Sequence, residues 1–533
     1  MTDGARLRDF AAPGAIVILH LVLAALAFKP APHVGGDNAV YLSVAQSILE
    51  GSYRDVFLPG TPPHVVYPPG FPLITAVGLA LGLEPWVGLK LITVFFSATV
   101  VFLTWLYARR EGSTLALVVA LLVAISPGVL ALSHWELSDV PFTAFVIAAL
   151  IAWRDASKST RATAVASLLT VAAYSIRSAG LPLIFAALLW LALGKQWRRL
   201  AAASAVMLIP AAAWWLYTGG QGGYFDQLLV GDAYVAESRI GVFDLLGRVR
   251  ENAVEYFAKH LPLLMAGPWV PWAVTALHLV VLAVSEWTLR IASKERSVLE
   301  LFAPLYAGMM LLWLPQFSGD RLILPLYPFM LLYAGLFVIR IGARLPGIAR
   351  RALLVAAPAS FALIALPAVI AIADRGIECT SLYRAGDRYP CVSEGWRDFF
   401  VVSDLTETML PRGSIVMSRK PAVLFVSSGH RGKLVPFSRE PSVLIDSARA
   451  AGARYVLLDY LDTIGSSYVV PAIMQRTRAF CVMHTMGPNR ATLFGIVPNA
   501  DRVPDERPDP GKADIEAPFA MCGPEYRAQS HQP

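Results

Sequence analysis

Six charged residues lie at the ends of long apolar runs in this 533-residue sequence. A charge near a membrane span is energetically costly, so each of them is a candidate functional residue. They are Asp37 in GGDNAVYLSVAQSIL, Lys90 in EPWVGLKLI, Glu136 and Asp139 in SHWELSDVP, Arg177 in AAYSIRSAGLPL and Arg321 in SGDRLILPLYP. The set combines three acids with three bases. Such a combination suits proton transfer beside a bound anion.

The three bases suit a phosphate group held at the depth of the lipid headgroups. Arg makes bidentate contacts with phosphate and Lys supplies a compact charge, so Lys90, Arg177 and Arg321 are predicted to bind phosphate. A carboxylate beside them can take a proton from an incoming hydroxyl or amine. A phosphate leaving group departs as a stable anion and needs charge stabilisation more than a proton. One base and a cationic clamp are therefore sufficient for glycosyl transfer from a lipid-phosphate sugar.

The elements that must position these residues are membrane-spanning helices. The chain has 56% hydrophobic and 16% charged residues, whereas soluble domains have about 25% charged residues. Its net charge of +7 is spread between the apolar runs, which argues against nucleic-acid binding. We predict a multi-span α-helical membrane protein. The expected eleven spans are 13–29, 86–108, 114–132, 140–153, 162–176, 180–194, 200–217, 263–289, 299–315, 322–339 and 352–373.

The charge distribution predicts the orientation of these spans. Lys and Arg are enriched in alternate connections, which places the N-terminus inside and the six charged residues outside. The inner face is then expected to hold only solvated Lys and Arg. An odd number of spans places residues 374–533 outside the cytoplasm, and we expect a multi-pass protein of the inner (cell) membrane.

The cysteines agree with that orientation. All four follow the last expected span, and disulfides persist in oxidising compartments. Proximity in the sequence favours the pairs Cys379–Cys391 and Cys481–Cys522. Four free thiols in a cytosolic tail are the alternative.

Two domains are expected: a membrane domain, 1–373, and a small extracytoplasmic α/β domain, 374–533. In the second domain we predict a helix over 438–452, capped by Ser438 and ended by Gly452. The stretch 501–514 is rich in Pro and charge and should be irregular. Short buried strands are predicted at 414–418, 453–461 and 491–497.

Two long outside loops, 30–85 and 218–262, mix polar and apolar residues at helical spacing. We predict amphipathic helices in them that lie on the outer membrane surface.

An ordered set of motifs resembles the GT-C glycosyltransferases. It comprises GGDNAVYLSVAQSIL, VYPPGFPL, SHWELSDVPF, IRSAGLPL and RLILPLYP. The set is similar, in particular, to bacterial relatives of the protein O-mannosyltransferases and to the lipid A aminoarabinose transferase. The resemblance covers about residues 10–340.

The resemblance implies a role for each charged residue. Asp37 corresponds to the catalytic acid of the family's first outside loop. Asp139, with Glu136 beside it, corresponds to the acid of the family's second outside loop, which here is the short segment SHWELSDVP between the third and fourth expected spans. Lys90 corresponds to the basic residue that meets the lipid phosphate. Arg177 and Arg321 fall where the family has basic residues near that phosphate. Further candidates for substrate contact are Tyr41, Tyr67, His64 and Tyr327, although Tyr67 could simply pack in a Pro-rich turn.

No cofactor is expected, and a divalent metal is the alternative. Many members of the family have two adjacent acids in the first loop, but here the second is Asn38, which weakens the case for a metal held by both. His33, His64 and His134 could approach Asp37, but they lack the spacing of metal ligands.

Each candidate also has a structural alternative. Asp37 could cap a helix that starts at Asn38, and Glu136 and Asp139 could be ordinary loop acids. Lys90 could extend its ammonium to the headgroups without a substrate. Arg177 and Arg321 could be partners of acids such as Asp139 or Asp320.

The predicted function is inverting glycosyl transfer at the outer face of the inner membrane, by a hexosyl- or pentosyltransferase. The donor would be a polyprenyl-phosphate sugar, and the acceptor a lipid, a cell-envelope glycan or a protein. A transporter or flippase of a lipid-linked or anionic substrate is the main alternative, and a membrane-anchored binding module is a third. A flippase would place its charges near the bilayer midplane, often in repeated halves, whereas a transferase should gather the charged residues around one cavity.

Overall fold

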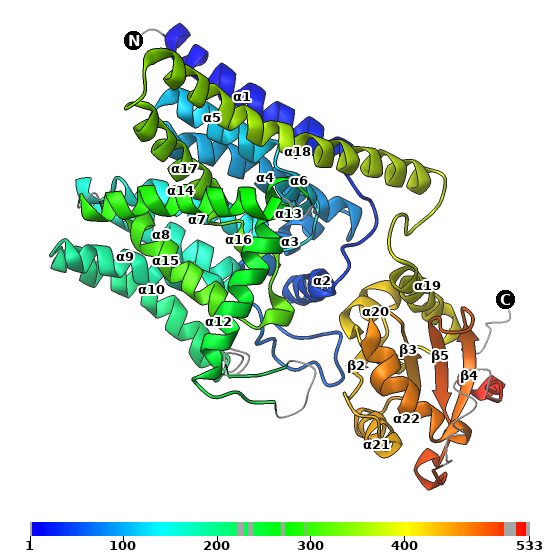
Figure 1. Cartoon of the computed structure of the whole chain (residues 1–533). Coiled ribbons are helices and arrows are strands. Elements are labelled where there is room, and N and C mark those ends of the chain that lie inside the picture. Colours follow the sequence, from blue (N-terminus) through cyan, green and yellow to red (C-terminus); the bar gives the residue numbers. More distant parts are fainter. Residues whose placement is uncertain are drawn as a thin grey trace.

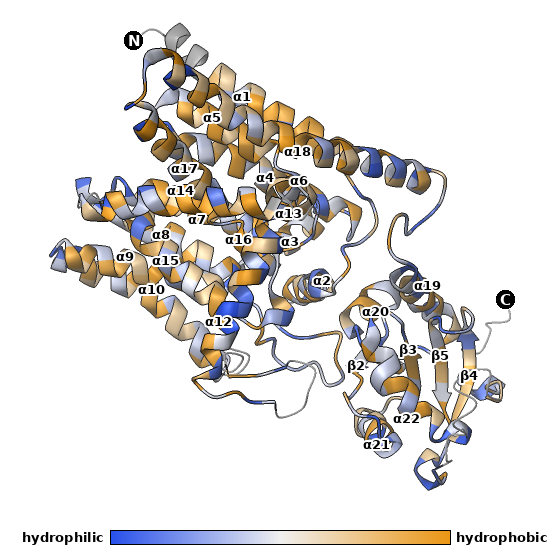
Figure 2. Cartoon of the chain, in the orientation of Figure 1, coloured by the Kyte–Doolittle hydropathy of each residue, from blue (hydrophilic) through white to orange (hydrophobic). Residues whose placement is uncertain are grey.

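The computed structural model describes residues 3–220, 229–232, 238–267, 272–293, 296–505 and 519–528. A bundle of apolar helices carries a smaller α/β module at one end (Figure 1). Hydrophobic residues cover most of the bundle helices, whereas the module mixes polar and apolar residues (Figure 2). The bundle helices are α1 (Asp3–Leu26), α4 (Val87–Ala108), α5 (Ser113–Ala124), α6 (Pro127–Leu132), α7 (Asp139–Trp153), α8 (Thr160–Ile176), α9 (Leu181–Leu193), α10 (Trp197–Tyr217), α13 (Leu261–Met265), α14 (Trp272–Ala292), α15 (Val298–Leu312), α16 (Asp320–Ile323), α17 (Tyr327–Gly342) and α18 (Gly347–Arg384).

Five helical segments in the described residues are long and apolar enough to cross a membrane. This finding supports a multi-span membrane protein, while the predicted count of eleven stays a prediction. Six further apolar helical segments in the described residues are shorter, at 10–17 residues, and one of them is Phe10–Leu26 of α1. The five long segments are Val87–Ala108, Asp139–Lys158, Trp197–Tyr217, Ala273–Ala292 and Gly347–Arg384.

Three of the expected spans are not continuous helices. The run 114–132 breaks between α5 and α6, where Ser126 caps the new helix and Pro127 occupies its first turn. The run 322–339 breaks between α16 and α17. The run 263–289 divides into α13 and α14, and residues 268–271 between them lie outside the described residues. The last expected span is longer than predicted, because α18 continues to Arg384, past the expected domain boundary at 373.

The first outside loop forms α2 (Asp37–Leu49) and α3 (Gly70–Ala80). The prediction that its helix lies on the membrane surface is wrong for α2. Ala39, Leu42 and Val44 are buried in it, and α2 packs between α3 and α20 (Pro421–Ser428) of the module. Both sides of the helix are therefore covered by protein.

The second outside loop contains α12 (Asp244–Glu255). Phe243 and Leu246 are exposed at this helix, and Arg248 and Asn252 are buried. This distribution fits a helix at a membrane surface, which stays a prediction. Residues 221–228 and 233–237 of the same loop lie outside the described residues.

The α/β module contains a five-stranded sheet in the order β2-β1-β3-β5-β4. Strand β1 is parallel to β2 and β3, and β5 is antiparallel to β3 and β4. The three predicted strands are confirmed as β1, β3 and β5, whereas the prediction lacked β2 and β4. The strands are β1 (Ile415–Ser418), β2 (Arg431–Leu434), β3 (Tyr455–Leu458), β4 (Phe480–Thr485) and β5 (Thr492–Ile496), and the larger helices are α19 (Glu394–Met409), α20, α21 (Pro441–Ala451) and α22 (Val470–Met474).

The predicted helix over 438–452 is observed as α21, but Ser438 does not cap it. The cap position is Glu440, because Pro441 has the fixed backbone angle suited to the first helical position. The Ser438 hydroxyl instead accepts a hydrogen bond from the Glu440 amide at 3.2 Å. Gly452 ends the helix with φ of 71°, as predicted. Of the stretch 501–514, residues 506–514 lie outside the described residues.

Both predicted disulfides are confirmed. Cys379 of α18 joins Cys391, which lies before α19. Cys481 of β4 joins Cys522. The first bond ties the chain where it leaves the bundle and enters the module.

The module docks onto the bundle through a shared apolar core. Leu42, Phe57 and Leu89 belong to one buried cluster with Phe399 and Leu424 of the module. The amide of Gly432 in β2 also donates to the carbonyl of Phe57 at 2.9 Å. These contacts fix the module beside α2.

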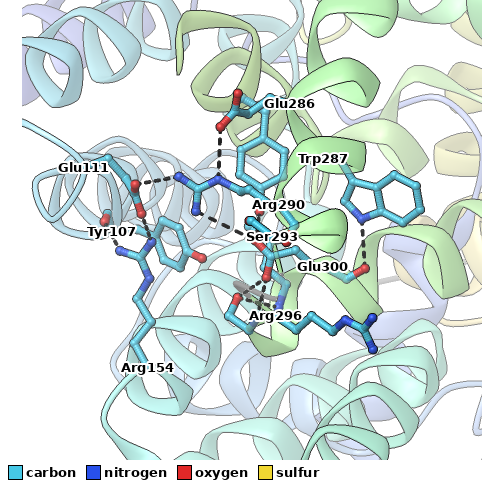
Figure 3. A network of polar contacts seen from close by, with 12 residues as sticks. Tyr107, Glu111, Arg154, Glu286, Trp287, Arg290, Ser293, Arg296 and Glu300 are labelled. Carbon is cyan, nitrogen blue, oxygen red and sulfur yellow. Dashed lines mark hydrogen bonds and ion pairs between the residues drawn. The ribbon is translucent and has the colours of Figure 1, made fainter. Parts of the chain in front are cut away.

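A buried polar network joins the helix ends at the other side of the bundle (Figure 3). Arg290 of α14 contacts Glu111 at 2.7 Å, and Glu111 also pairs with Arg154 at the end of α7. Arg340 of α17 contacts Glu286 at 2.9 Å. Glu286 is only 1% exposed, so the expectation that this face holds only solvated Lys and Arg is wrong. Acids and bases pair here because an isolated buried charge would be costly.

Candidate active site

A cavity of about 200 Å³ lies at the module end of the bundle. Asp37, Arg177 and Arg321 line it together, whereas the predicted site residues Lys90, Glu136 and Asp139 are not among its described lining residues. Asp37, Arg177 and Arg321 come from three elements: the first turn of α2, the residue after α8, and α16. The other lining residues are Tyr41, Val66, Tyr67, Pro68, Ile176, Ser178, Trp313 and Phe317.

Asp37 reaches the cavity because the chain turns sharply before it. Gly35 and Gly36 have φ of 147° and 106°, a conformation that favours glycine, and Gly36 occupies the cap position of α2. No side chain caps this helix. The alternative in which Asp37 serves as the cap is therefore wrong. Its carboxylate instead lies 3.3 Å from the guanidinium of Arg321.

Asp37 is held in its ionised form. Burial alone would raise the pKa of this carboxyl, but the charge of Arg321 and a hydrogen bond from Tyr67 hold the pKa below its usual value. A carboxylate that is ionised at neutral pH can accept a proton.

Arg177 is fixed by Asp139, to which its guanidinium is ion-paired. Asp139 is only 4% exposed and lies behind Arg177, and it is not among the described residues that line the cavity. The structural alternative for Arg177 thus holds in part: Arg177 has an acid partner and still faces the cavity.

Lys90 and Glu136 form a buried ion pair of 3.2 Å. The ammonium also donates to the carbonyl of His134 at 2.9 Å, and Glu136 accepts from the amide of His33 at 3.2 Å. Neither side chain is among the described lining residues of the cavity. The pair connects α4 to the first outside loop, at His33, and to the short connection between α6 and α7, at His134 and Glu136.

Two of the four further candidates line the cavity. The rings of Tyr41 and Tyr67 have centroids 4.5 Å apart, and the Tyr41 hydroxyl is bonded to Ser138 at 2.9 Å. His64 is buried beneath them, where it contacts Asp55 at 2.6 Å and accepts from the Tyr67 amide. Tyr327 is fully buried at the start of α17 and is not a described lining residue.

The three histidines considered for metal binding have other neighbours. His33 lies against the ring of Trp135, and His134 faces Phe28. In the described ranges, no three His, Cys, Asp or Glu side chains are grouped so that they could hold a metal ion.

A second cavity, of about 270 Å³, is almost wholly apolar. It lies among α13, α14, α15 and α17, and reaches from Tyr256 to Trp287 and Tyr333. Ile323 lines it only two residues after Arg321, so α16 contributes to both cavities.

Six of the described lining residues were absent from the predicted site, and two of these six, Trp313 and Phe317, are aromatic. These two lie in WLPQFSGDR, between α15 and α16. The signal available in the sequence was a Pro-containing break beside two aromatic residues and directly before Arg321.

Solved structures share this fold. ArnT from Cupriavidus metallidurans bound to undecaprenyl phosphate matches 91% of this chain and 98% of its own, with a TM-score of 0.55 and 14% identity. The archaeal oligosaccharyltransferase AglB from Archaeoglobus fulgidus, in complex with an inhibitory peptide and a dolichol-phosphate, matches 94% of this chain and 75% of its own. Its TM-score is 0.58 and its identity 12%. No family model and no curated protein matches the sequence.

The chain therefore has the fold of the GT-C glycosyltransferases, as the sequence motifs predicted. Since the identities are low, the likeness establishes the fold alone.

Proposed function

We propose that this protein is an inverting glycosyltransferase that takes a sugar from a polyprenyl-phosphate donor. The observation that carries the proposal is the convergence of Asp37, Arg177 and Arg321 on one cavity. These three residues are far apart in the sequence, so only the packing of the helices brings them to the same cavity.

The two arginines would bind the donor phosphate. Guanidinium groups match phosphate oxygens bidentately, and Arg177 and Arg321 enter the cavity from separate elements. The apolar cavity beside Arg321 would accept the polyprenyl tail, since it is lined by apolar side chains of α13, α14, α15, α16 and α17. ArnT and AglB, whose structures contain undecaprenyl phosphate and dolichol-phosphate, support this donor class.

Asp37 would act as the general base. It takes the proton from the acceptor hydroxyl or amine as that group forms a bond to the anomeric carbon. The bond between the anomeric carbon and the phosphate oxygen breaks on the opposite face, and its electron pair leaves with the lipid phosphate. One displacement of this kind inverts the sugar configuration. The phosphate needs no proton, because the arginines stabilise its charge.

The remaining charged candidates would hold the cavity-lining residues and the nearby loops in position. Asp139 orients Arg177, to which it is paired. Lys90, expected from the sequence to meet the phosphate, is instead proposed to pair with Glu136 and so to join α4, the α6–α7 connection and the first outside loop. We propose no metal in the reaction.

The site is proposed to face away from the cytoplasm in the inner membrane. The cavity and both disulfides lie toward the module, and stable disulfides suit an exported domain. The acceptor is proposed to be an envelope lipid, glycan or protein.

A flippase is the competing function, and product analysis separates the two. The purified protein would be incubated in liposomes with labelled polyprenyl-phosphate sugars and envelope acceptors. A transferase releases polyprenyl phosphate and yields a labelled acceptor. Donor that crosses the bilayer without bond cleavage would indicate a flippase. Asp446→Asn, a change of an exposed Asp on α21, is the matched control for variants of Asp37.

A further inference from the structure

Lys420 extends from the α/β module toward the catalytic carboxylate. It lies between β1 and α20, and its ammonium donates to the carbonyl of Gly35 at 2.6 Å. Gly35 is two residues before Asp37. The contact links positions 385 residues apart in the chain.

The approach of Lys420 to this turn is close. A Cβ atom on Gly36 would lie 3.2 Å from the Lys420 Cδ. The positive φ favours glycine at position 36, and the lysine stem leaves little room for a Cβ atom there. The ammonium is also 5.8 Å from the centre of the Trp396 ring on α19, so the module holds the side chain from its other side.

Contacts of neighbouring elements hold the backbone of Lys420 in place. The preceding residue, Arg419, contacts Asp459 at 3.1 Å and Asp462 at 2.7 Å, at the ends of the parallel strands. On the bundle side, α20 packs against α2, the helix that begins at Asp37. Lys420 therefore lies where the module meets α2, beside the turn that precedes the proposed base.

We propose that Lys420 is a positioning residue of the active site, through which the module orders the Gly35–Gly36 turn and places a fixed positive charge near Asp37. The module then completes the catalytic centre. For its kinetic part, this inference rests on the proposed transferase function.

The electrostatics agree with the geometry. Lys420 is one of the charges that keep the pKa of Asp37 low, although Arg321 has the larger effect. Burial lowers the pKa of the Lys420 ammonium, and the charged groups that act on it are Asp37 from α2, and Arg419, Asp459 and Asp462 from the module. Loss of the ammonium should therefore raise the pKa of Asp37.

Lys420→Met tests the inference in the full-length protein, because it keeps the apolar stem and removes the charge and the donor. Lys433→Met is the control, since Lys433 is an exposed residue of β2 in the same module. Lys420→Arg keeps the charge and should restore most of the function.

Hydrogen exchange of residues 33–41 gives a readout that does not depend on activity. Loss of a charge-assisted hydrogen bond should accelerate exchange there roughly tenfold or more in Lys420→Met, and not in Lys433→Met. Unchanged exchange overturns the ordering role, even if no sugar transfer is found. Faster exchange without any transfer in the wild type would instead leave the ordering role standing and refute the transferase.

Kinetics test the electrostatic part. In Lys420→Met, kcat should fall about ten- to a hundredfold, the donor KM should stay within about twofold, and the acid limb of the pH profile should move to higher pH. The donor KM is spared because Lys420 is not among the described residues lining the cavity. An acid limb at the wild-type pH, or a large rise in donor KM, overturns the proposed role.

Discussion

The guanidinium of Arg321 lies 3.3 Å from the carboxylate of Asp37, although 284 residues separate them in the sequence. The ion pair places the proposed base beside one of the proposed phosphate ligands. A donor phosphate on Arg321 would therefore bring the anomeric carbon close to Asp37. It would also draw Arg321 partly away from the carboxylate and free that group to accept a proton.

Asp37→Asn should insert and fold normally but lose transfer activity by roughly 10²- to 10⁴-fold, since an amide cannot accept the acceptor's proton. Asn keeps the size of the side chain, and α2 has no side-chain cap to lose. Product formation would be measured at equal protein level, with Asp446→Asn as the control. Near wild-type transfer would assign the base to another residue.

Arg177→Gln and Arg321→Gln should each weaken donor use by about ten- to a hundredfold, the effect of a lost charge-assisted contact. Only Arg321→Gln should also change the pH profile. Arg321 lowers the pKa of Asp37, so the loss of Arg321 should raise that pKa. As the pH is lowered, activity of Arg321→Gln should then begin to fall at a higher pH than in the wild type. Donor kinetics over a pH series measure both effects. Identical pH profiles in the two variants would contradict the contact between Arg321 and Asp37.

Lys90→Met should impair folding rather than donor binding. The change leaves Glu136 buried without its partner, which costs about 3–5 kcal/mol and should lower the thermal unfolding midpoint. The double variant Lys90→Met/Glu136→Gln should be more stable than Lys90→Met alone, since no charge is then left unpaired. A Lys90→Met protein with normal stability and a donor KM raised about tenfold would indicate that Lys90 binds the donor phosphate.

Fusions test the orientation. Alkaline phosphatase folds in an active form only outside the cytoplasm, so a fusion after residue 400 should be active and one after residue 350 inactive. Mass spectrometry of the non-reduced protein should also recover Cys379 linked to Cys391. The reverse fusion pattern would place the module and the cavity in the cytoplasm and would rule out a donor site on the outer face.

Local features of the sequence were sufficient for much of the architecture. Long apolar runs with charges at their ends predicted a multi-span membrane protein, and ordered motifs predicted the GT-C fold. Short runs of buried residues identified β1, β3 and β5. Cysteine proximity predicted both disulfides. These features can be recognised in local stretches of the sequence, because the spacing of apolar residues indicates which side of a helix or strand is buried.

The partner of each charge was decided only by the tertiary structure. Asp37, Lys90, Asp139, Arg177 and Arg321 look alike in the sequence, as charges near span ends. Helix packing divides them: Lys90 is buried against Glu136, Asp139 lies behind Arg177, and Asp37 faces Arg321 in the cavity.

The approach of Lys420 to Gly35 depends in turn on how the module docks against α2. The physical reason is the same in each case. The energy of a charge in a membrane protein depends on its nearest partner and on its burial, and both are set by the packing of segments that lie far apart in the chain.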